Sequence, residues 1–562
     1  KAGNALIGGD NNVFLGCYAG LLSAVISNNV FLGTNSGKCI NHASAVNNIV
    51  IGNEAMMGGS TAANNSGDVN VAIGRAALKV NVSGANNVAI GFEAGTTNVS
   101  GASNVFIGKS AGTLGTEQSD SVAIGNFAMY GNGTTAPTGD FNIALGSCAL
   151  QVVCTGHDDI AIGKQALQSI TSGHWNVAIG LNAGQSSVAN NRGVFIGYYA
   201  ARTRTAGDEN IAIGNQALHG STTGGAACGE KNIAIGSFAG ECVSIGKNNI
   251  FLGNQAGKLT TIGCFNILIG SEVANTSTIT GTENTIIGYD AAKAITDAER
   301  NVLIGSSAGR AIIGGSSNTF VGPFTGCKTT TGEMNVAIGC GALSKGAAGN
   351  QNVVIGRNAG EYTCAGGSKN VFVGNYAGKY NGCGIHQVFI GTYAGMKLHP
   401  TTAATHNIAL GLCAMVGIDT SVTTGIDNVA IGLKTLEKLS DGNNNIAIGK
   451  EAMEGGAAGI GGDNNIALGF SALKAITTGS NNVAIGQNAG DAVINSQNSI
   501  YIGTNAGTAD TTGQANIFIG CNVASAYVEG SSNVFVADNS IKCLGKSGAA
   551  AIGSVALGTQ VG

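Results

Sequence analysis

The residues of this sequence best suited to chemistry are His157, Asp158 and Asp159, which join an imidazole to two carboxylates in one short run. Such a group could bind a metal ion or transfer protons. Asp159, however, stands at a position where most repeats of this chain have Asn, and its two neighbours fall in the adjoining turn. The pattern therefore favours a solvated turn, and we predict no catalytic, cofactor-binding or metal-binding residue and no cofactor.

N-linked glycans are the second kind of chemistry that the residues suggest. Five Asn-X-Ser/Thr sequons could carry sugars if the chain passes through a eukaryotic secretory pathway. The candidate acceptors are Asn64, Asn81, Asn98, Asn132 and Asn275. Asn81 and Asn98 occupy the same position in successive repeats, so full glycosylation of both would crowd the sugars.

These residues belong to a repeat that fills almost the whole chain. The run Asn-Asn-Val-Ala-Ile-Gly, or a close variant, returns at intervals that are mostly 17 residues. We call the glycine that closes each run the marker glycine, for example Gly180. There are 30 marker glycines from Gly8 to Gly520, and Ala537 takes the same place in one further copy. Repetition of this kind predicts a solenoid of about 31 coils.

Composition agrees with one long packed domain. The chain has 562 residues with 92 Gly, only 3 Pro and 10% charged residues, which fits neither collagen nor a charged disordered chain. A net charge of -4 offers no basic face for nucleic acid. The sequence contains no run of 18 apolar residues, so we predict no membrane-spanning helix. We expect a repetitive solenoid over residues 1–538 and a C-terminal cap, or a junction to a further stalk or chaperone domain, over residues 539–562.

The fold class expected from the repeat is all-β, a parallel β-solenoid. Val177 and Ile179 are two residues apart and point to one side of a strand, while Ala178 points to the other. We place Val and Ile inside the coil. A second, shorter strand is expected in segments such as 96–101, with glycine at both corners. Coils about 4.8 Å apart would make a body roughly 150 Å long, with the repeated Asn forming a hydrogen-bonded ladder.

The residue between Val and Ile is apolar in every copy. On the assignment above it faces outward, and a strand that is apolar on both faces is buried on both. Identical chains packed side by side would cover this face, most simply as a closed trimer, although a dimer or a filament meets the same need. The candidate trimer-interface residues are Phe14, Phe31, Phe106, Phe195, Phe251, Phe320, Phe372, Phe389, Tyr501, Phe518 and Phe535.

One pair among the 14 cysteines has a position that favours a bond. Cys364 and Cys383 fall eight and nine residues after their marker glycines in successive coils. Stacking at strand spacing would bring them nearly above one another, so we predict a disulfide. The other cysteines show no CxxC pair and no zinc-like spacing with His, and we expect buried thiols.

The copies of Asn-Val-Ala-Ile-Gly, and the related run at residues 121–125, resemble the head repeats of trimeric autotransporter adhesins, the YadA-like heads. The 17-residue period is closer to long-repeat relatives in tail fibres and surface fibres of phages, large viruses and bacteria. The resemblance implies a left-handed β-roll in a homotrimer on a cell or virion surface. It implies a structural fibre or adhesin head, extracellular and without enzymatic activity, that mediates attachment or assembly.

Two other functions stay open at this point. A parallel β-helix enzyme acting on polysaccharides would need grouped Asp, Glu, Arg or Lys at a shared position of the repeat. An ice-binding solenoid would need a flat, regular array of Thr. A receptor or glycan, if the fibre binds one, would meet the inserted loops at residues 57–69, 130–140, 219–230 and 396–406, which lie between the core strands.

Overall fold

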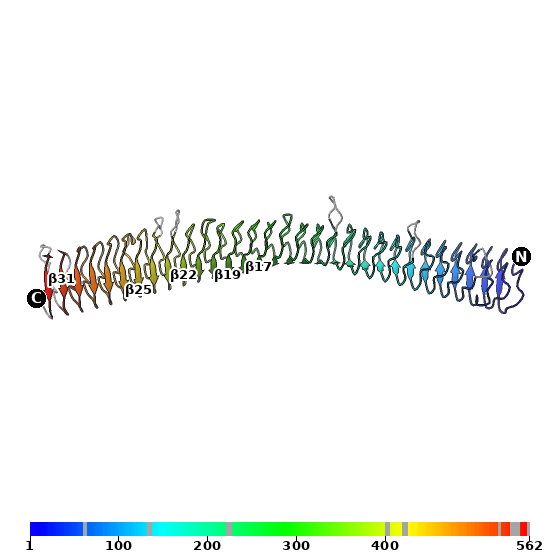
Figure 1. Cartoon of the computed structure of the whole chain (residues 1–562), viewed down its shortest axis with the longest axis horizontal. Helices are drawn as coiled ribbons and strands as arrows, with labels where there is room; N and C mark the ends of the chain where they lie inside the picture. The colour runs from blue at the N-terminus through cyan, green and yellow to red at the C-terminus, as the bar shows by residue number, and fades with distance from the viewer. Residues whose placement is uncertain are drawn as a thin grey trace. The chain divides into compact units, whose positions relative to one another are not determined.

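The computed structural model describes residues 1–59, 65–131, 138–220, 228–398, 405–418, 425–526, 530–539 and 551–558. Within these ranges the regular secondary structure is β-strand throughout, without a helix. The chain divides into two compact units, Lys1–Thr282 and Glu283–Gly562. Each unit is a parallel β-solenoid, in which every coil contributes one short strand to a row of strands (Figure 1).

The strands of the first unit are three residues long and recur once per coil. They are β1 (Val13–Leu15), β2 (Val30–Leu32), β3 (Ile49–Ile51), β4 (Val71–Ile73), β5 (Val88–Ile90), β6 (Val105–Ile107), β7 (Val122–Ile124), β8 (Ile143–Leu145), β9 (Ile160–Ile162), β10 (Val177–Ile179), β11 (Val194–Ile196), β12 (Ile211–Ile213), β13 (Ile233–Ile235), β14 (Ile250–Leu252) and β15 (Ile267–Ile269).

The second unit continues the same pattern and ends in a few additional strands. They are β16 (Thr285–Ile287), β17 (Val302–Ile304), β18 (Thr319–Val321), β19 (Val336–Ile338), β20 (Val353–Ile355), β21 (Val371–Val373), β22 (Val388–Ile390), β23 (Ile408–Leu410), β24 (Val429–Ile431), β25 (Ile446–Ile448), β26 (Ile466–Leu468), β27 (Val483–Ile485), β28 (Ile500–Ile502), β29 (Ile517–Ile519), β30 (Gly530–Ser531), β31 (Val534–Val536), β32 (Ala551–Ile552) and β33 (Val555–Leu557).

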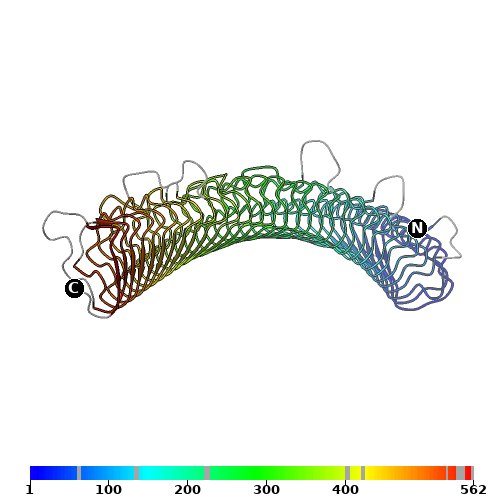
Figure 2. The same cartoon turned by 60° about the vertical axis from the view of Figure 1, so that its left-hand side comes forward.

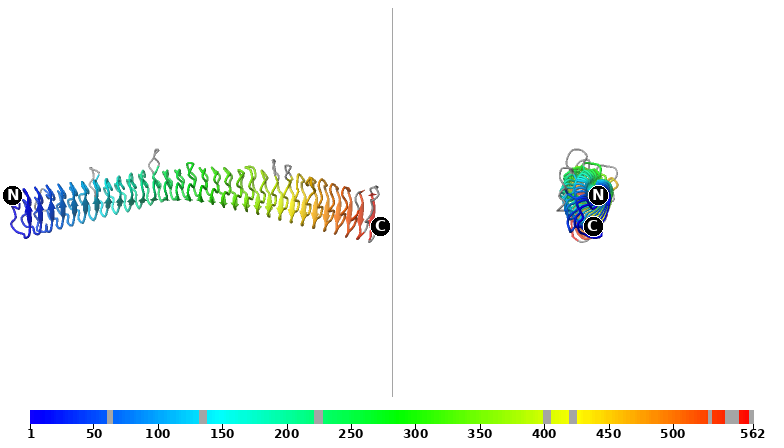
Figure 3. Two further views of the ribbon diagram at one scale, coloured as in Figure 1. Left: turned by 180° about the vertical axis from the view of Figure 1, so that it is seen from behind. Right: turned by 90° about the vertical axis from the view of Figure 1, so that its right-hand side faces the viewer.

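Neighbouring strands pair in parallel with like positions above one another. Val177 pairs with Val194 and Ile179 with Ile196, so each side chain stacks on its equivalent in the next coil. Figure 2 shows the coils of each unit nested one behind the next, and the left view of Figure 3 shows the strands within each unit side by side. The predicted all-β parallel solenoid with a 17-residue period is therefore confirmed.

The coil count is slightly lower than the sequence suggested. Each of the 29 strands from β1 to β29 is followed by a marker glycine. The run ending at Gly8, which the sequence analysis counted as a copy, forms no such strand, and Gly8 instead makes a bridge to Val25. This run has the composition of the motif but lies only eight residues before Gly16, and so falls in a different position of the coil.

The second strand expected in each coil is not regular. Residues 96–101 form turns and bends rather than a strand. The segment still stacks on its neighbours, because the backbone N–H of Val82 donates to the carbonyl of Val99 at 2.8 Å. A coil of this protein thus has one strand, and hydrogen bonds between coils hold the remainder in place.

The corners contain non-glycine residues in the left-handed backbone region as well as glycines. In the ninth coil Asp158, Gln165 and Leu167 have φ of 58°, 60° and 46°. The marker glycines serve a separate need, which is close approach between coils. A Cβ on Gly180 would lie 2.5 Å from the carbonyl oxygen of Gly197, and φ there is 135°. Only glycine fits that corner without moving the backbone.

Part of the C-terminal segment, for which the sequence predicts a cap or junction, joins the stack. β33 pairs with β31 in parallel, with Val555 beside Val534 and Leu557 beside Val536. β32 pairs in the same sense with β30. The described residues after Asn539 therefore add a further rung to the second unit.

Candidate functional site

Four positions of the repeat fill the interior of a coil. In the ninth coil these are Ala161 at the middle of the strand, Ala166, Leu167 and Ile170, and none of them has exposed surface. The middle strand residue thus points inward. In the next two coils Ala178 and Phe195 are likewise fully buried.

This arrangement corrects the sequence-based assignment of the two strand faces. The residues predicted at a trimer interface form the core of the single chain. They are Phe31, Phe106, Phe195, Phe251, Phe320, Phe372, Phe389, Tyr501, Phe518 and Phe535, each at most 1% exposed, together with the half-buried Phe14 in the first coil. Their rings stack along the interior, as Phe372 does on Phe389 with 5.2 Å between ring centroids.

A pattern of side-chain size in the sequence identifies the inward face. Where the middle strand residue is Phe or Tyr, the residue six positions later is Gly or Ala in the described coils; where it is Ala, that residue is often Leu or Met. The two positions share one space, because a Cβ on Gly112 would lie 2.4 Å from the ring of Phe106. Exchange of large and small side chains between two positions is the mark of a filled interior.

The first and third residues of each strand point outward instead. We call these side chains the aliphatic face. They are Val, Ile or Leu in β1–β29 except Thr285 and Thr319. Ile90, Ile124 and Ile179 are 37%, 39% and 37% exposed. Each unit therefore carries two ladders of exposed branched side chains along its row of strands.

Buried asparagines run beside the aliphatic face and support the predicted ladder. The backbone N–H of Asp159 donates to Asn142 Oδ1 at 3.0 Å, and Asn142 Nδ2 donates to the carbonyl of Gly156 at 2.8 Å. Equivalent bonds recur from coil to coil, with the amide serving a carbonyl about fourteen residues ahead, as Asn232 does for Gly246. Both of these Asn142 bonds go to the next coil, and other ladder amides also donate to the preceding coil, as Asn249 Nδ2 does to Asn232 Oδ1 at 3.0 Å. The ladder asparagines thus have a structural role.

Asp159 is the one acidic residue among the five that replace Asn in this ladder, the others being Ser121, Gly193, Gln387 and Ser499. Its Oδ1 accepts from the backbone N–H and from Nδ2 of Asn176, both at 2.9 Å. Its Oδ2 takes the place of the donor amide and is buried without a hydrogen-bond partner. Burial raises the pKa of this carboxyl to about 7, although the bonds from Asn176 act in the opposite direction.

The burial of two further asparagines bears on the predicted glycans. Asn81 is fully buried and its Nδ2 donates to the carbonyl of Gly84, and Asn98 is 1% exposed with the same bond to Gly101. A glycan would have to occupy these buried nitrogens, so the prediction of acceptors at Asn81 and Asn98 is wrong. Asn64 and Asn132 lie outside the described residues. Asn275 is half-buried and stays a prediction.

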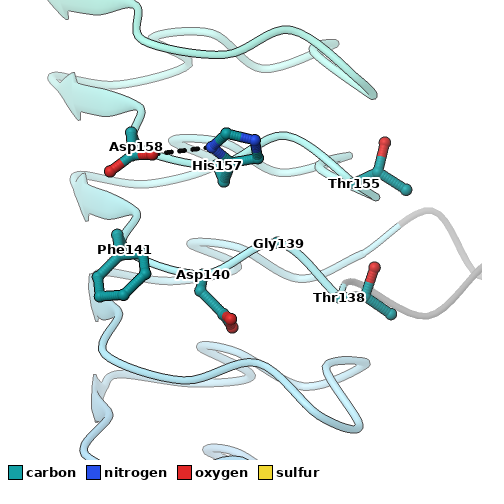
Figure 4. A pocket seen from close by; sticks show the side chains of 7 residues that line it. All are labelled: Thr138, Gly139, Asp140, Phe141, Thr155, His157 and Asp158. Carbon is teal, nitrogen blue, oxygen red and sulfur yellow. Dashed lines mark hydrogen bonds and ion pairs between the residues drawn. The ribbon is translucent and has the colours of Figure 1, made fainter.

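His157 and Asp158 line a hollow of about 360 Å³ between two coils of the first unit (Figure 4). One coil contributes Thr155, His157 and Asp158, and the coil before it contributes Thr138, Gly139, Asp140 and Phe141. His157 and Asp158 were considered as a possible site from the sequence, whereas Asp140 and Phe141 were not. These two residues stand 17 residues earlier, and only the stacking of coils brings them next to His157 and Asp158.

Hydrogen bonds and ring contacts fix the hollow's side chains. His157 Nδ1 lies 2.8 Å from Asp158 Oδ2, and the His157 ring stacks on His174 with 3.9 Å between centroids. Burial, and then the nearby His157, lower the pKa of His174. Trp175, which is 52% exposed, packs edgewise on both imidazoles. Phe141 is 57% exposed and contributes an open ring face.

The predicted disulfide is present. Cys364 and Cys383 are bonded across neighbouring coils of the second unit, with their Cα atoms 5.1 Å apart. The expectation of buried thiols for the other cysteines is met only in part. Among the described free cysteines Cys154 is buried, whereas Cys17, Cys340 and Cys521 are exposed and the others are intermediate.

Comparison with known proteins does not place the chain in a family. No family model matches the sequence, and no curated protein matches it either. Within the described ranges, no group of three or more His, Cys, Asp or Glu side chains is arranged to hold a metal ion. No helix in the same ranges is long and apolar enough to cross a membrane.

Proposed function

We propose that the protein is a structural, non-enzymatic component of a cell or virion exterior, which associates with copies of itself into a fibre or head that mediates attachment or assembly. The observation that carries this proposal is the aliphatic face. Two ladders of half-buried or exposed Val, Ile and Leu side chains form an apolar surface along each unit. Surfaces of this size on soluble proteins mark sites of interaction.

The area of the face suits a stable interface. The first unit has 15 strands with two outward side chains each. At the exposures above, these leave on the order of 1,000 Å² of apolar surface. That exceeds the largest patch of a typical monomer, about 300–600 Å², and compares with the roughly 800 Å² that each partner buries in a stable complex.

A second copy of the chain is the partner that fits this face best. The outward side chains recur at the spacing of parallel strands, about 4.8 Å, and only a body with the same rise keeps its side chains in step over many coils. Another copy has that rise by construction. Closure about a common axis covers every face, and the resemblance to trimeric adhesin heads favours three chains.

The experiment that tests the proposal compares two substitutions in one coil. Ile179 lies on the aliphatic face and is 37% exposed, whereas Val188 lies elsewhere on the coil and is 40% exposed. Ile179→Asp is expected to weaken association, because a carboxylate would be buried without a partner in the interface. Val188→Asp adds the same charge at a similar exposure and is expected to leave association unchanged.

The readout is the solution mass by light scattering over a range of concentrations, with circular dichroism to show that the solenoid is intact. We expect wild type and Val188→Asp at three times the mass of one chain, and Ile179→Asp shifted toward one chain at the same concentration. A wild-type protein that is monomeric at every concentration would refute the proposal. Equal dissociation by both variants would refute the assignment of the interface to the aliphatic face.

A further inference from the structure

We propose that the hollow formed by Thr138–Phe141 and Thr155–Asp158 binds an organic cation, the ammonium or guanidinium group of a lysine or arginine side chain on a partner protein. The hollow lies within a single chain, beside the start of two strands (Figure 4). The inference therefore does not depend on self-association, and it names a chemistry by which an attached partner would be recognised.

The first argument is an aromatic ring without a cation. This protein places its own Lys and Arg over exposed rings repeatedly, as with Arg75 over Phe92 at 5.4 Å and Lys450 over Phe470 at 5.5 Å. Among the described residues no cation lies over Phe141, although its ring is 57% exposed and lines the hollow. A cation supplied from outside would meet the same ring face.

The second argument is local charge. Residues 110–163 contain five acidic residues and no Lys or Arg. Two of these acidic residues, Asp140 and Asp158, line the hollow. One oxygen of Asp140 accepts from the backbone N–H of Ser119 at 2.7 Å, and one oxygen of Asp158 is held by His157, so each carboxylate is positioned and keeps a second oxygen. No Lys or Arg of the described chain forms an ion pair with either carboxylate.

The lining groups fit one ligand geometry. Phe141 and Asp158 lie at one end of the hollow, so an ammonium group over the Phe141 ring would have the Asp158 carboxylate on the next coil beside it, whereas Thr138 and Thr155 lie at the other end (Figure 4). Carboxylates together with an aromatic face are the usual surroundings of a desolvated organic cation. No Lys or Arg lines the hollow, so an anion would find no fixed positive charge there.

The protein carries its own reporter for this site. Trp175 is the only tryptophan of the chain, and its ring lies 5.4 Å from that of His157 between centroids. We would titrate the intact protein with N-acetyl-lysine amide and follow tryptophan fluorescence, with calorimetry of the same titration. The Nε-acetylated form of the same compound is the neutral control. Saturable binding of the charged probe that weakens with added salt is expected, and none of the neutral probe.

Variants show whether the probe binds in the hollow or binds non-specifically to the protein surface. Phe141→Leu and Asp158→Asn are each expected to weaken binding by about 3- to 10-fold. Phe265→Leu removes a ring at the same position of another coil, 59% exposed, and should bind as wild type does. Equal binding of the neutral probe, no binding by either readout, or unchanged affinity in Phe141→Leu would overturn the proposal. Solution mass measured alongside shows whether association changes independently.

Discussion

Replacing Asp159 by Asn should stabilise its coil at neutral and alkaline pH. The asparagines of the ladder place an amide nitrogen opposite a carbonyl of the next coil, as Asn142 does for Gly156 at 2.8 Å. At position 159 the corresponding atom is Oδ2, which is fully buried and has no partner. The carbonyl fourteen residues ahead is that of Gly173. Two oxygens without a proton between them repel each other, whereas a protonated carboxyl or an amide can donate.

The size of the effect follows from the pKa. Burial raises the pKa of Asp159 from 3.8 to about 7. This difference in pKa between the unfolded and folded states corresponds to at most about 4 kcal/mol of free energy of unfolding between low and high pH. Because the folded-state value is the higher one, the folded coil keeps a proton that the unfolded coil releases. This stabilisation is complete below about pH 4 and is lost as the pH rises toward 7. Asp159→Asn removes that loss.

Hydrogen exchange read by mass spectrometry is the suitable assay, because solenoids open locally and a global midpoint would dilute a single coil. Peptides spanning residues 155–176 should be equally protected in wild type and variant at pH 4. At pH 8 they should be better protected in Asp159→Asn. Comparison of proteins at the same pH cancels the intrinsic pH dependence of exchange.

Asp158→Asn is the matched control, since Asp158 is adjacent, carries the same group and has a side chain that is 42% exposed. It should leave protection of the ladder peptides unchanged. If Asp159→Asn and wild type exchange alike at pH 8, the buried oxygen carries no penalty and the reasoning fails. The same conclusion would follow if Asp158→Asn reproduced the gain.

Two further predictions concern the interior and the disulfide. Gly112→Ala should destabilise its coil by about 1–3 kcal/mol, because the new Cβ would meet the Phe106 ring at 2.4 Å and φ is +60°; adding Phe106→Ala should relieve the clash, and local hydrogen exchange would measure both. Cys383→Ser should lower protection between Cys364 and residue 383 by up to about 3 kcal/mol, since the bond closes a separation of 19 residues; exchange in the oxidised protein, compared with a reduced sample, checks this.

The sequence was sufficient for the positions of strands β1–β29, because each of them is followed by a marker glycine. Gly180 shows the reason, since its Cβ would lie 2.5 Å from the next coil's carbonyl oxygen. The same regularity located the bonded pair Cys364 and Cys383, whose positions differ by one residue in successive coils. Stacking in register turns such positions directly into distances.

The assignment of strand faces failed because alternation alone does not tell inside from outside when both faces are apolar. Ala178 is fully buried while Ile179 is 37% exposed, the opposite of the size order that a core suggests. The exchange of large and small residues between positions six apart, as in Phe106 and Gly112, carries the missing information. It was readable from the sequence once two positions of the coil were compared.

The backbone conformation of the corners and the residues that line the hollow could not be predicted from the sequence. Left-handed backbone occurs at Phe141, Asp158 and Trp175, residues of quite different chemistry. The backbone N–H of each of these residues donates to a carbonyl of the preceding coil, so residue type carries little signal there. The hollow depends on which side chains of two coils lie on the same side of the turn, and only the folded coil decides this.

The structure exchanges the inner and outer faces of the strand predicted from the sequence, so different residues must be mutated to test self-association. The reason to expect self-association is unchanged. Corner positions of this chain show what solvent-facing residues look like in it, since the residue just before the ladder Asn is often Asn, Asp, Glu, Lys or Arg. Outward strand positions, a few residues further on, are Val, Ile or Leu in nearly every coil. Exposure to water cannot account for that contrast within one repeat, whereas burial against another surface can. Val and Ile therefore form the face that we expect another chain to cover, whereas Phe and Ala form the core of the single chain.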